Sequence, residues 1–366
     1  MSRSVVANTL GPRAFFEHLS QNYENEYWEY EKRLGFGAFG FTALLKRKGS
    51  SVQPAQRMAV KFAIGTDPRR RQTLHTEIDV LKMVNGASHI VSILASCPNI
   101  AKVTASRHSG DNNILISASD AFEGFVGIDG PAVALEYLEY GDIMGLVNKI
   151  RPTDRHVPNR ILWSFFLCFI RASVGLAYPS RQPIGSNARI LEELPSDHSP
   201  ATESPMEHRD FNARNIMLAV GDEPEHEIGV MAKLIDFGLA TDGVGTTGSP
   251  TNIFDAALTT SFLAAPKAGI PNTTCMYQES STKAVNLVGT DEPPFPLPWL
   301  DPELRDILAR CMYVHEQQRP TLQEALQVAR DAVHSKTATS FQAPDMETDS
   351  AVNAFVQEFI FNVPQQ

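Results

Sequence analysis

The chain has 366 residues, of which 43% are apolar and 20% charged. This is the composition of ordinary globular proteins, and the length allows two or three compact units. The net charge of −10 argues against binding to duplex nucleic acid, because neutralising its phosphates takes clustered lysine and arginine. We therefore expect no nucleic-acid partner.

Neither export nor membrane insertion is indicated. Residues 1–21 lack a continuous apolar stretch, so we expect no signal peptide. The longest apolar run, ILWSFFLCFI at 161–170, is too short to span a bilayer and predicts a buried helix. The cysteines form no CxxC or Cys/His cluster, which predicts neither a zinc site nor a disulfide framework. They are Cys97, Cys168, Cys275 and Cys311. Reduced thiols fit a cytoplasmic or nuclear location.

The first half of the chain is rich in strand patterns. Residues 1–24 form an N-terminal extension, and 25–138 alternate as strands and turns. One helix is predicted at 71–86, where apolar residues recur every three or four positions. The residues at 98–130 have little periodicity and predict a loop or hairpin insertion, which is followed by a strand at 131–138.

The second half, residues 139–335, has helical periodicity at 157–178 and again at 301–333, where Asp301 before Pro302 is a good helix start. Between these helices, 179–206 is rich in proline and serine and predicts a surface insertion. The last segment, 336–366, is expected to be a flexible tail, in which AVNAFVQEFIFNV has the pattern of a short amphipathic helix that docks back.

A glycine-rich stretch lies between two strand patterns. Gly35, Gly37 and Gly40 have the spacing GxGxxG, which permits close approach of a backbone to phosphates. A dinucleotide fold would need a helix next, but FTALLKRK alternates like a strand. Taken alone, the stretch is equally consistent with an ordinary glycine hairpin.

A lysine and a glutamate are expected to pair. Lys61 ends an apolar strand, and Glu77 falls on the apolar face of the predicted helix, beside Ile78. A carboxylate in such a position needs a cationic partner to offset its loss of hydration. The pair would aim an ammonium group at the phosphates of a nucleotide.

The stretch EHRDFNARNIML at 207–218 and the stretch KLIDFGLA at 233–240 supply oxygen ligands. Asp210, Asn215 and Asp236 carry the donors that Mg²⁺ prefers, although single Asp and Asn residues in loops usually form caps or turns. The order of glycine loop, lysine, glutamate, His-Arg-Asp with Asn five residues later, and Asp-Phe-Gly makes a chance arrangement improbable.

With these motifs in this order, residues 30–333 resemble the catalytic domain of eukaryotic protein kinases. The resemblance implies an α+β fold of two lobes, a small β-rich one with one main helix and a larger, mainly helical one, with ATP and Mg²⁺ bound between them. Leu135 falls at the gatekeeper position, and Arg319 in QQRPT matches the closing Arg-Pro signature.

The resemblance also implies roles for individual residues. Asp210 would be the catalytic base, assisted by Lys61, Glu77 and Arg214, and Asn215 and Asp236 would hold the metal. The positions that would bind ATP are Leu34, Gly35, Gly37, Gly40, Ala59, Lys61, Glu136, Leu138, Asp142 and Met217.

The chain departs from the kinase pattern on the acceptor side. Asn212 stands where Ser/Thr kinases carry a lysine, and Arg214 where some tyrosine kinases carry an arginine. No Ala-Pro-Glu is visible after Asp-Phe-Gly, and the next helix is predicted to start at Asn252. This shortened segment resembles that of kinase-like proteins of filamentous fungi. We predict little or no control by loop phosphorylation, for which only Thr246, Thr247 and Ser249 are available.

Three functions fit these features. The first is a protein kinase with a hydroxyl substrate of unresolved type. The second is a small-molecule kinase of the aminoglycoside or choline type, because such enzymes also keep H-x-D-x-x-x-x-N and lack Ala-Pro-Glu. The third is a nucleotide-binding pseudokinase that acts as a scaffold. The presence of suitable residues at all five catalytic positions argues against this third function.

Overall fold

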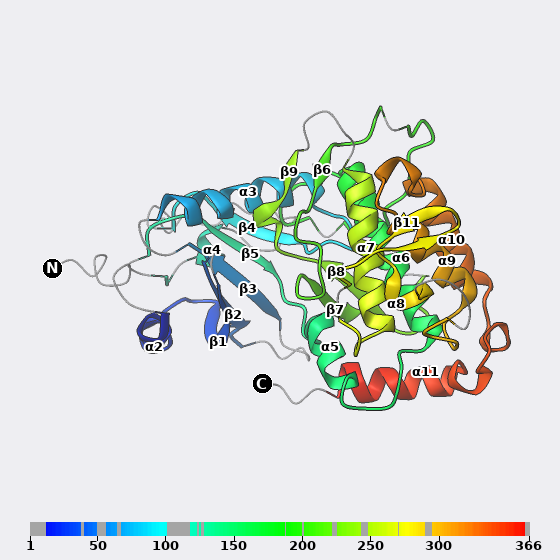
Figure 1. Cartoon of the computed structure of the whole chain (residues 1–366). Helices are drawn as coiled ribbons and strands as arrows, with labels where there is room; N and C mark the ends of the chain where they lie inside the picture. The colour runs from blue at the N-terminus through cyan, green and yellow to red at the C-terminus, as the bar shows by residue number, and fades with distance from the viewer. Residues whose placement is uncertain are drawn as a thin grey trace.

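The computed structural model describes most of the chain, and all structural statements refer to that part. The described residues are 12–37, 40–49, 56–63, 67–100, 118–122, 124–125, 128–186, 188–199, 201–221, 225–242, 248–269, 271–289 and 295–362. The fold is of the α+β class, as predicted. A sheet occupies one part and helices dominate the other (Figure 1).

The N-terminal part is built on a five-stranded antiparallel sheet with the order β1-β2-β3-β5-β4. The strands are β1 (Trp28–Gly37), β2 (Gly40–Arg47), β3 (Arg57–Phe62), β4 (Ile93–Cys97) and β5 (Ala132–Glu136). Alternate residues of a strand face opposite sides. In β3, Met58, Val60 and Phe62 are buried on one face, which leaves Ala59 and Lys61 on the other.

Helices accompany this sheet on both sides. Within the N-terminal extension, the structure has α2 (Pro12–Asn22), whose Phe15 ring lies 5.1 Å from the ring of Phe41 in β2, so this helix is part of the sheet's core. The predicted helix is α3 (Pro68–Val84), which buries Ile78 together with Val133 of β5 in the main core. A short α4 (Ala118–Phe122) falls within the region predicted as a loop, of which 101–117 lie outside the described residues.

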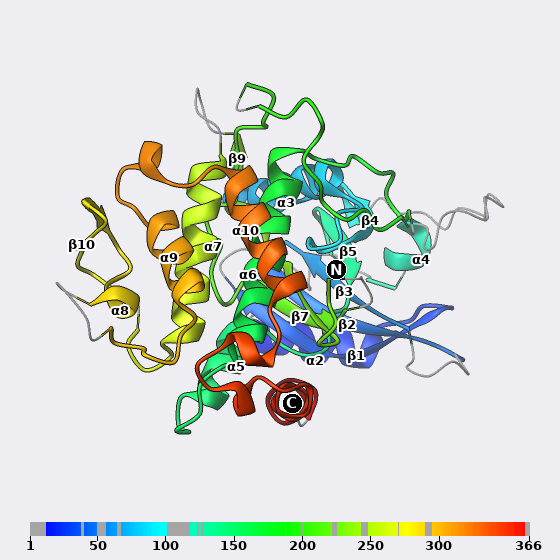
Figure 2. The ribbon, with the colours of Figure 1, turned by 90° about the vertical axis from the view of Figure 1, so that its right-hand side faces the viewer.

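The C-terminal part is mainly helical. Its helices are α5 (Ile143–Ile150), α6 (Asn159–Ala177), α7 (Ser249–Ala264), α8 (Val285–Val288), α9 (Pro302–Cys311), α10 (Leu322–Ser335) and α11 (Asp349–Val356). Single turns complete it at Phe237–Leu239 (η2), Glu316–Gln318 (η3), Ala338–Ser340 (η4), Pro344–Met346 (η5) and Gln357–Phe361 (η6). Helix α6 packs against α7 and α10 (Figure 2).

Helix α6 contains the apolar run noted in the sequence. Among the described helices it is the one long and apolar enough to cross a membrane, but 94% of its most apolar window is buried inside the protein. It is therefore placed as the core helix that the sequence predicted, because neighbouring helices cover its apolar surface.

Three small antiparallel ladders lie beside the helices. They are formed by β6 (Met206–Glu207) with β9 (Thr241–Asp242), β7 (Ile216–Val220) with β8 (Val230–Leu234), and β10 (Cys275–Tyr277) with β11 (Ser280–Thr282). The β7–β8 ladder joins the two sequence motifs, since it follows Asn215 and precedes Asp236.

The C-terminal segment, expected to be flexible, packs on the helical part as far as residue 362. Glu347 is only 1% exposed, and its carboxylate accepts the backbone N–H groups of Asn159 (2.7 Å) and Arg160 (3.0 Å). Helix α6 begins after Pro158, which offers no side-chain cap of its own. Glu347 therefore caps a core helix from the tail, and α11, the predicted amphipathic helix, buries Phe355.

Two further expectations need correction. Helix α7 begins at Ser249 and not at Asn252, because Pro250 falls in its first turn, a favourable place for proline. The segment 179–206, expected as a surface insertion, has many exposed residues but also carries Glu192, which is buried and accepts the N–H of His89 at 2.7 Å.

Candidate active site

Lys61 lies between two carboxylates from distant parts of the chain. Its Nζ is 2.6 Å from Glu77 Oε2 of α3 and 3.0 Å from Asp236 Oδ1, which follows β8. Strand alternation places Lys61 on the face of β3 opposite Met58, Val60 and Phe62, and Glu77 is a buried residue of α3. The pairing expected from burial is therefore present, and a third charged group joins it.

Lys61 and Asp236 stabilise each other's charge, whereas burial, assisted by the charge of Asp236, raises the pKa of Glu77 above its ordinary value although Lys61 opposes this. Burial by itself lowers the pKa of Lys61, but the charges of Glu77 and Asp236 outweigh it and raise the pKa above its ordinary value. Burial likewise raises the pKa of Asp236, but Lys61 outweighs it and lowers that pKa. Lys61 is thus a firmly held ammonium group and Asp236 a firmly held carboxylate.

Asp236 has an unusual backbone that directs its side chain. Its φ of 62° lies in the left-handed region, where residues other than glycine are uncommon. The same carboxylate accepts the N–H of Gly238, and Phe237 is fully buried with its ring 4.8 Å from that of His208. The buried Phe237 anchors the turn while Asp236 faces Lys61.

Two asparagines hold the carboxylate of Asp210. Asn212 Nδ2 donates to Asp210 Oδ1 at 2.7 Å, and Asn215 Nδ2 donates to Asp210 Oδ2 at 2.7 Å and to its carbonyl at 2.9 Å. Asn212, the departure from the Ser/Thr kinase pattern, therefore acts on Asp210 itself. Arg214, predicted as catalytic, is exposed and makes no ion pair within the described residues.

His208 links the two motifs. Its Nε2 lies 3.0 Å from the carbonyl of Ile235, and its Nδ1 lies 3.2 Å from the N–H of Asp210. Burial lowers the pKa of His208 to about 4, so the ring is neutral, with Nε2–H donating and Nδ1 accepting. The backbone N–H of His208 in turn donates to Asn252 of α7.

Packing explains why glycine is required at one position of the glycine-rich stretch and not at another. In the β1–β2 hairpin Gly37 pairs with Gly40, and residues 38 and 39 lie outside the described part. A Cβ on Gly40 would stand 2.5 Å from the carbonyl oxygen of Phe62, so packing of the sheet alone requires glycine there. A Cβ on Gly35 would meet nothing within 4 Å, so packing does not explain that glycine.

The remaining positions predicted to bind ATP come from several elements. Ala59 pairs with Leu135, and Met217 bridges to Asp142. Leu138 is buried, and Leu34 in β1 is exposed. Asp142 is the N-cap of α5, accepting the N–H of Gly145 at 2.6 Å. The side chain of Glu136 is turned to a buried partner, Lys233, at 2.7 Å.

Arg319 contacts backbone carbonyls and an aromatic ring. It donates to the carbonyls of Pro250 (2.8 Å) and Tyr313 (2.9 Å), and its guanidinium lies 4.7 Å from the ring centre of Phe254. Nearby on α7, burial and the charges of Glu207 and Asp210 raise the pKa of Asp255 to about 7, although Arg319 opposes this. Of the possible phosphorylation positions, Thr246 and Thr247 lie outside the described residues, and Ser249 is buried.

The structure thus brings Lys61, Glu77 and Asp236 into direct contact, and binds Asn215 to Asp210. Backbone pairing connects the two groups, because the N–H of Ile235 donates to the carbonyl of Asn215 at 2.9 Å. Sequence reasoning missed Lys233 and Asp255, which carry no motif of their own. A scan of the chain against models of known protein families finds no match.

Proposed function

We propose that this chain is an ATP- and Mg²⁺-dependent phosphotransferase of the protein kinase type, which transfers the γ-phosphate of ATP to a hydroxyl group. The observation that carries the proposal is the contact of Lys61 with both Glu77 and Asp236. Burying an ammonium group between two carboxylates costs free energy, because all three charges lose hydration. Such a group would serve to position the phosphates of a nucleotide beside a metal ligand.

The metal-binding residues fit a hard cation. The amide N–H₂ of Asn215 donates to Asp210, and Asp236 Oδ1 accepts from Lys61. No hydrogen bond among the described residues involves Asn215 Oδ1 or Asp236 Oδ2. These two oxygens would hold Mg²⁺, which prefers oxygen ligands and would neutralise charge on the transferred phosphoryl group.

Asp210 would act as the base. Its carboxylate is oriented by Asn212 and Asn215, so that an acceptor hydroxyl placed against it would be aligned and lose its proton during transfer. Lys61 would hold the phosphates of ATP. Since positioning and charge neutralisation supply most of this catalysis, these residues suffice for the chemistry.

A second candidate acceptor is a small hydroxyl compound. It is favoured by the brief connection between Gly238 and the start of α7 at Ser249, which is short for a peptide-docking segment. A peptide library and a panel of aminoglycosides and choline, tested with the same labelled ATP, would separate the two acceptor classes.

The deciding experiment measures ATP turnover with Mg²⁺ for the full chain and for Lys61→Met and Asp210→Asn. The matched controls are Lys82→Met and Asp79→Asn, two exposed residues of α3 that form an ion pair with each other at 3.7 Å. We expect turnover in the wild type and both controls and its loss in both site variants. The proposed enzyme activity would be refuted if the wild type shows no turnover, or if turnover is unchanged in both site variants.

A thermal-shift measurement with ATP and Mg²⁺ distinguishes the pseudokinase alternative from the active enzyme. A ligand that binds only the folded state raises Tm by mass action. A shift that Lys61→Met abolishes, without turnover in any acceptor panel, would assign a nucleotide-binding scaffold in place of the enzyme.

A further inference from the structure

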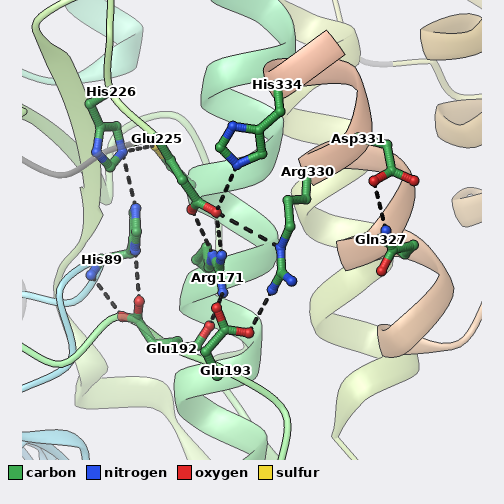
Figure 3. A network of polar contacts seen from close by, with 11 residues as sticks. His89, Arg171, Glu192, Glu193, Glu225, His226, Gln327, Arg330, Asp331 and His334 are labelled. Carbon is green, nitrogen blue, oxygen red and sulfur yellow. Dashed lines mark hydrogen bonds and ion pairs between the residues drawn. The ribbon is translucent and has the colours of Figure 1, made fainter.

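Three metal-ligating side chains meet deep in the protein, away from the candidate active site. They are His89, which follows α3, Cys168 in the middle of α6, and His226, which precedes β8. Their exposed fractions are 0%, 1% and 4%. Figure 3 shows the two histidine rings facing each other, within a larger network of polar contacts.

The distances match those between the ligands of one tetrahedral ion. His226 Nε2 lies 3.2 Å from His89 Nε2 and 3.3 Å from Cys168 Sγ, and the three ligand atoms all lie within 4.8 Å of one another. Zinc bonds of about 2.0 Å to nitrogen and about 2.3 Å to sulfur, at tetrahedral angles, separate two nitrogens by about 3.3 Å and a nitrogen from a sulfur by about 3.5 Å.

A carboxylate fixes the orientation of His89. Glu192 accepts from His89 Nδ1 at 2.7 Å with one oxygen and from its backbone N–H at 2.7 Å with the other. A proton on Nδ1 leaves the lone pair of Nε2 directed at the cluster. Histidines that bind metals are held in this way by carboxylates, which set the tautomer and strengthen the ligand.

An arginine supports the other side of the cluster. Arg171, fully buried in α6, donates from Nε to Glu225 at 2.9 Å and also contacts the backbone carbonyl of Glu192. Glu225 directly precedes His226 in the chain. Arg171 therefore ties together the two segments that carry Glu192 and His226, as Figure 3 shows.

The charges of the cluster balance around a dication. A Cys168 thiolate and the Glu192 carboxylate supply two negative charges, and Glu225 is already paired with Arg171. Zn²⁺ with neutral His89 and His226 would make this buried site neutral. His226 Nδ1 has no hydrogen-bond partner among the described residues, so the role of this ring rests on Nε2.

We propose that His89 Nε2, Cys168 Sγ and His226 Nε2 bind one zinc ion that fastens α6 to the segments before β4 and β8. Thiolate and imidazole are the ligands that zinc favours, and a water molecule would take the fourth position. Because the ligands are buried, the ion would bind during folding and contribute to stability. The proposal is independent of any phosphotransferase activity.

The alternative is a metal-free hydrogen-bonded triad, in which a protonated His89 balances Glu192. To distinguish the two, the full chain, carrying an affinity tag without histidines, is expressed in zinc-supplemented medium. Zinc and copper are then measured by mass spectrometry in the wild type, Cys168→Ser and His226→Gln. The matched control is Cys311→Ser, because Cys311 is equally buried but belongs to α9.

We expect about one zinc per chain in the wild type and in Cys311→Ser, and its loss in both ligand variants. Since a ligand variant can fail to fold, Co²⁺ is also titrated into chelator-treated wild-type protein. A sulfur-to-cobalt charge-transfer band supports the site. A wild type that holds no zinc and gives no such band overturns the proposal, and stoichiometric copper in place of zinc overturns the choice of metal.

Discussion

Lys233 Nζ lies 2.7 Å from Glu136 Oε1, and this pair joins β8 to the end of β5. Lys233 is 1% exposed and Glu136 18%. The same oxygen of Glu136 also accepts the N–H of Ser92 at 2.7 Å. The end of β5, where Glu136 is one of the positions predicted to bind ATP, is therefore held by an ion pair that connects the sheet to the helical part.

Breaking this pair should destabilise the protein strongly. Lys233→Met leaves the Glu136 carboxylate buried without its counter-charge, which costs about 3 kcal/mol of unfolding free energy. The double variant Lys233→Met, Glu136→Gln should regain most of that loss, because both charges are gone and the amide oxygen of Gln can still accept the N–H of Ser92. Urea unfolding measures the unfolding free energies of the single and the double variant. The control is Lys46→Met, because Lys46 forms an exposed ion pair with Glu29. Equal losses in Lys233→Met and Lys46→Met would contradict the prediction.

The tail should stabilise the helical part through its cap on α6. Glu347→Ala removes the acceptor of the Asn159 and Arg160 N–H groups, and we expect a loss of about 2 kcal/mol. Glu358→Ala is the control, since Glu358 is a tail glutamate that is 56% exposed and forms an ion pair with Arg155. Chemical unfolding that gives equal stabilities for the two variants would refute the capping role.

Asp255 should make stability depend on pH. Its pKa is about 7 in the folded protein against an ordinary 3.8, mainly because of burial and the charges of Glu207 and Asp210. The unfolded chain thus loses this proton first, so the wild type loses stability as pH rises from 3.8 to about 7. Asp255→Asn avoids this loss.

The gain in Tm of Asp255→Asn over the wild type should therefore be larger at about pH 8 than at about pH 4. The fully exposed Asp154, which has one weak contact to Lys267 at 3.4 Å, provides the control Asp154→Asn. A gain that is the same at both pH values would show that the Asp255 carboxyl titrates normally.

Under the proposed function, Glu77→Gln should impair catalysis more than folding. Without the charge of Glu77, Lys61 is held by Asp236 alone, and a misplacement of about 1 Å costs about 100-fold in kcat/KM for ATP. The control is Glu17→Gln in α2, because Glu17 forms an exposed ion pair with Arg13. Unchanged kcat/KM in a folded Glu77→Gln protein would remove Glu77 from the site.

Local features of the sequence predicted elements well where the signal is short-range. The apolar spacing from Leu74 to Val84 predicted α3, and Asp301 before Pro302 predicted the start of α9, where Asp301 accepts the N–H of Glu303. Helix α7 starts at Ser249, before the predicted Asn252, because Pro250 is favourable in its first turn. Burial reasoning also predicted the contact of Lys61 with Glu77, since a carboxylate on an apolar helix face needs a cation.

By itself the sequence singled out the residues that we propose for the chemistry: the lysine, the glutamate, and the two motifs with Asp210, Asn215 and Asp236. Only the tertiary structure decided which groups meet across long separations. His89 and Glu192 are 103 positions apart, and His89 and His226 are 137 apart, with no shared motif. Helical and strand periods report neighbours within a few residues, whereas such contacts depend on how whole elements pack, which no local pattern records.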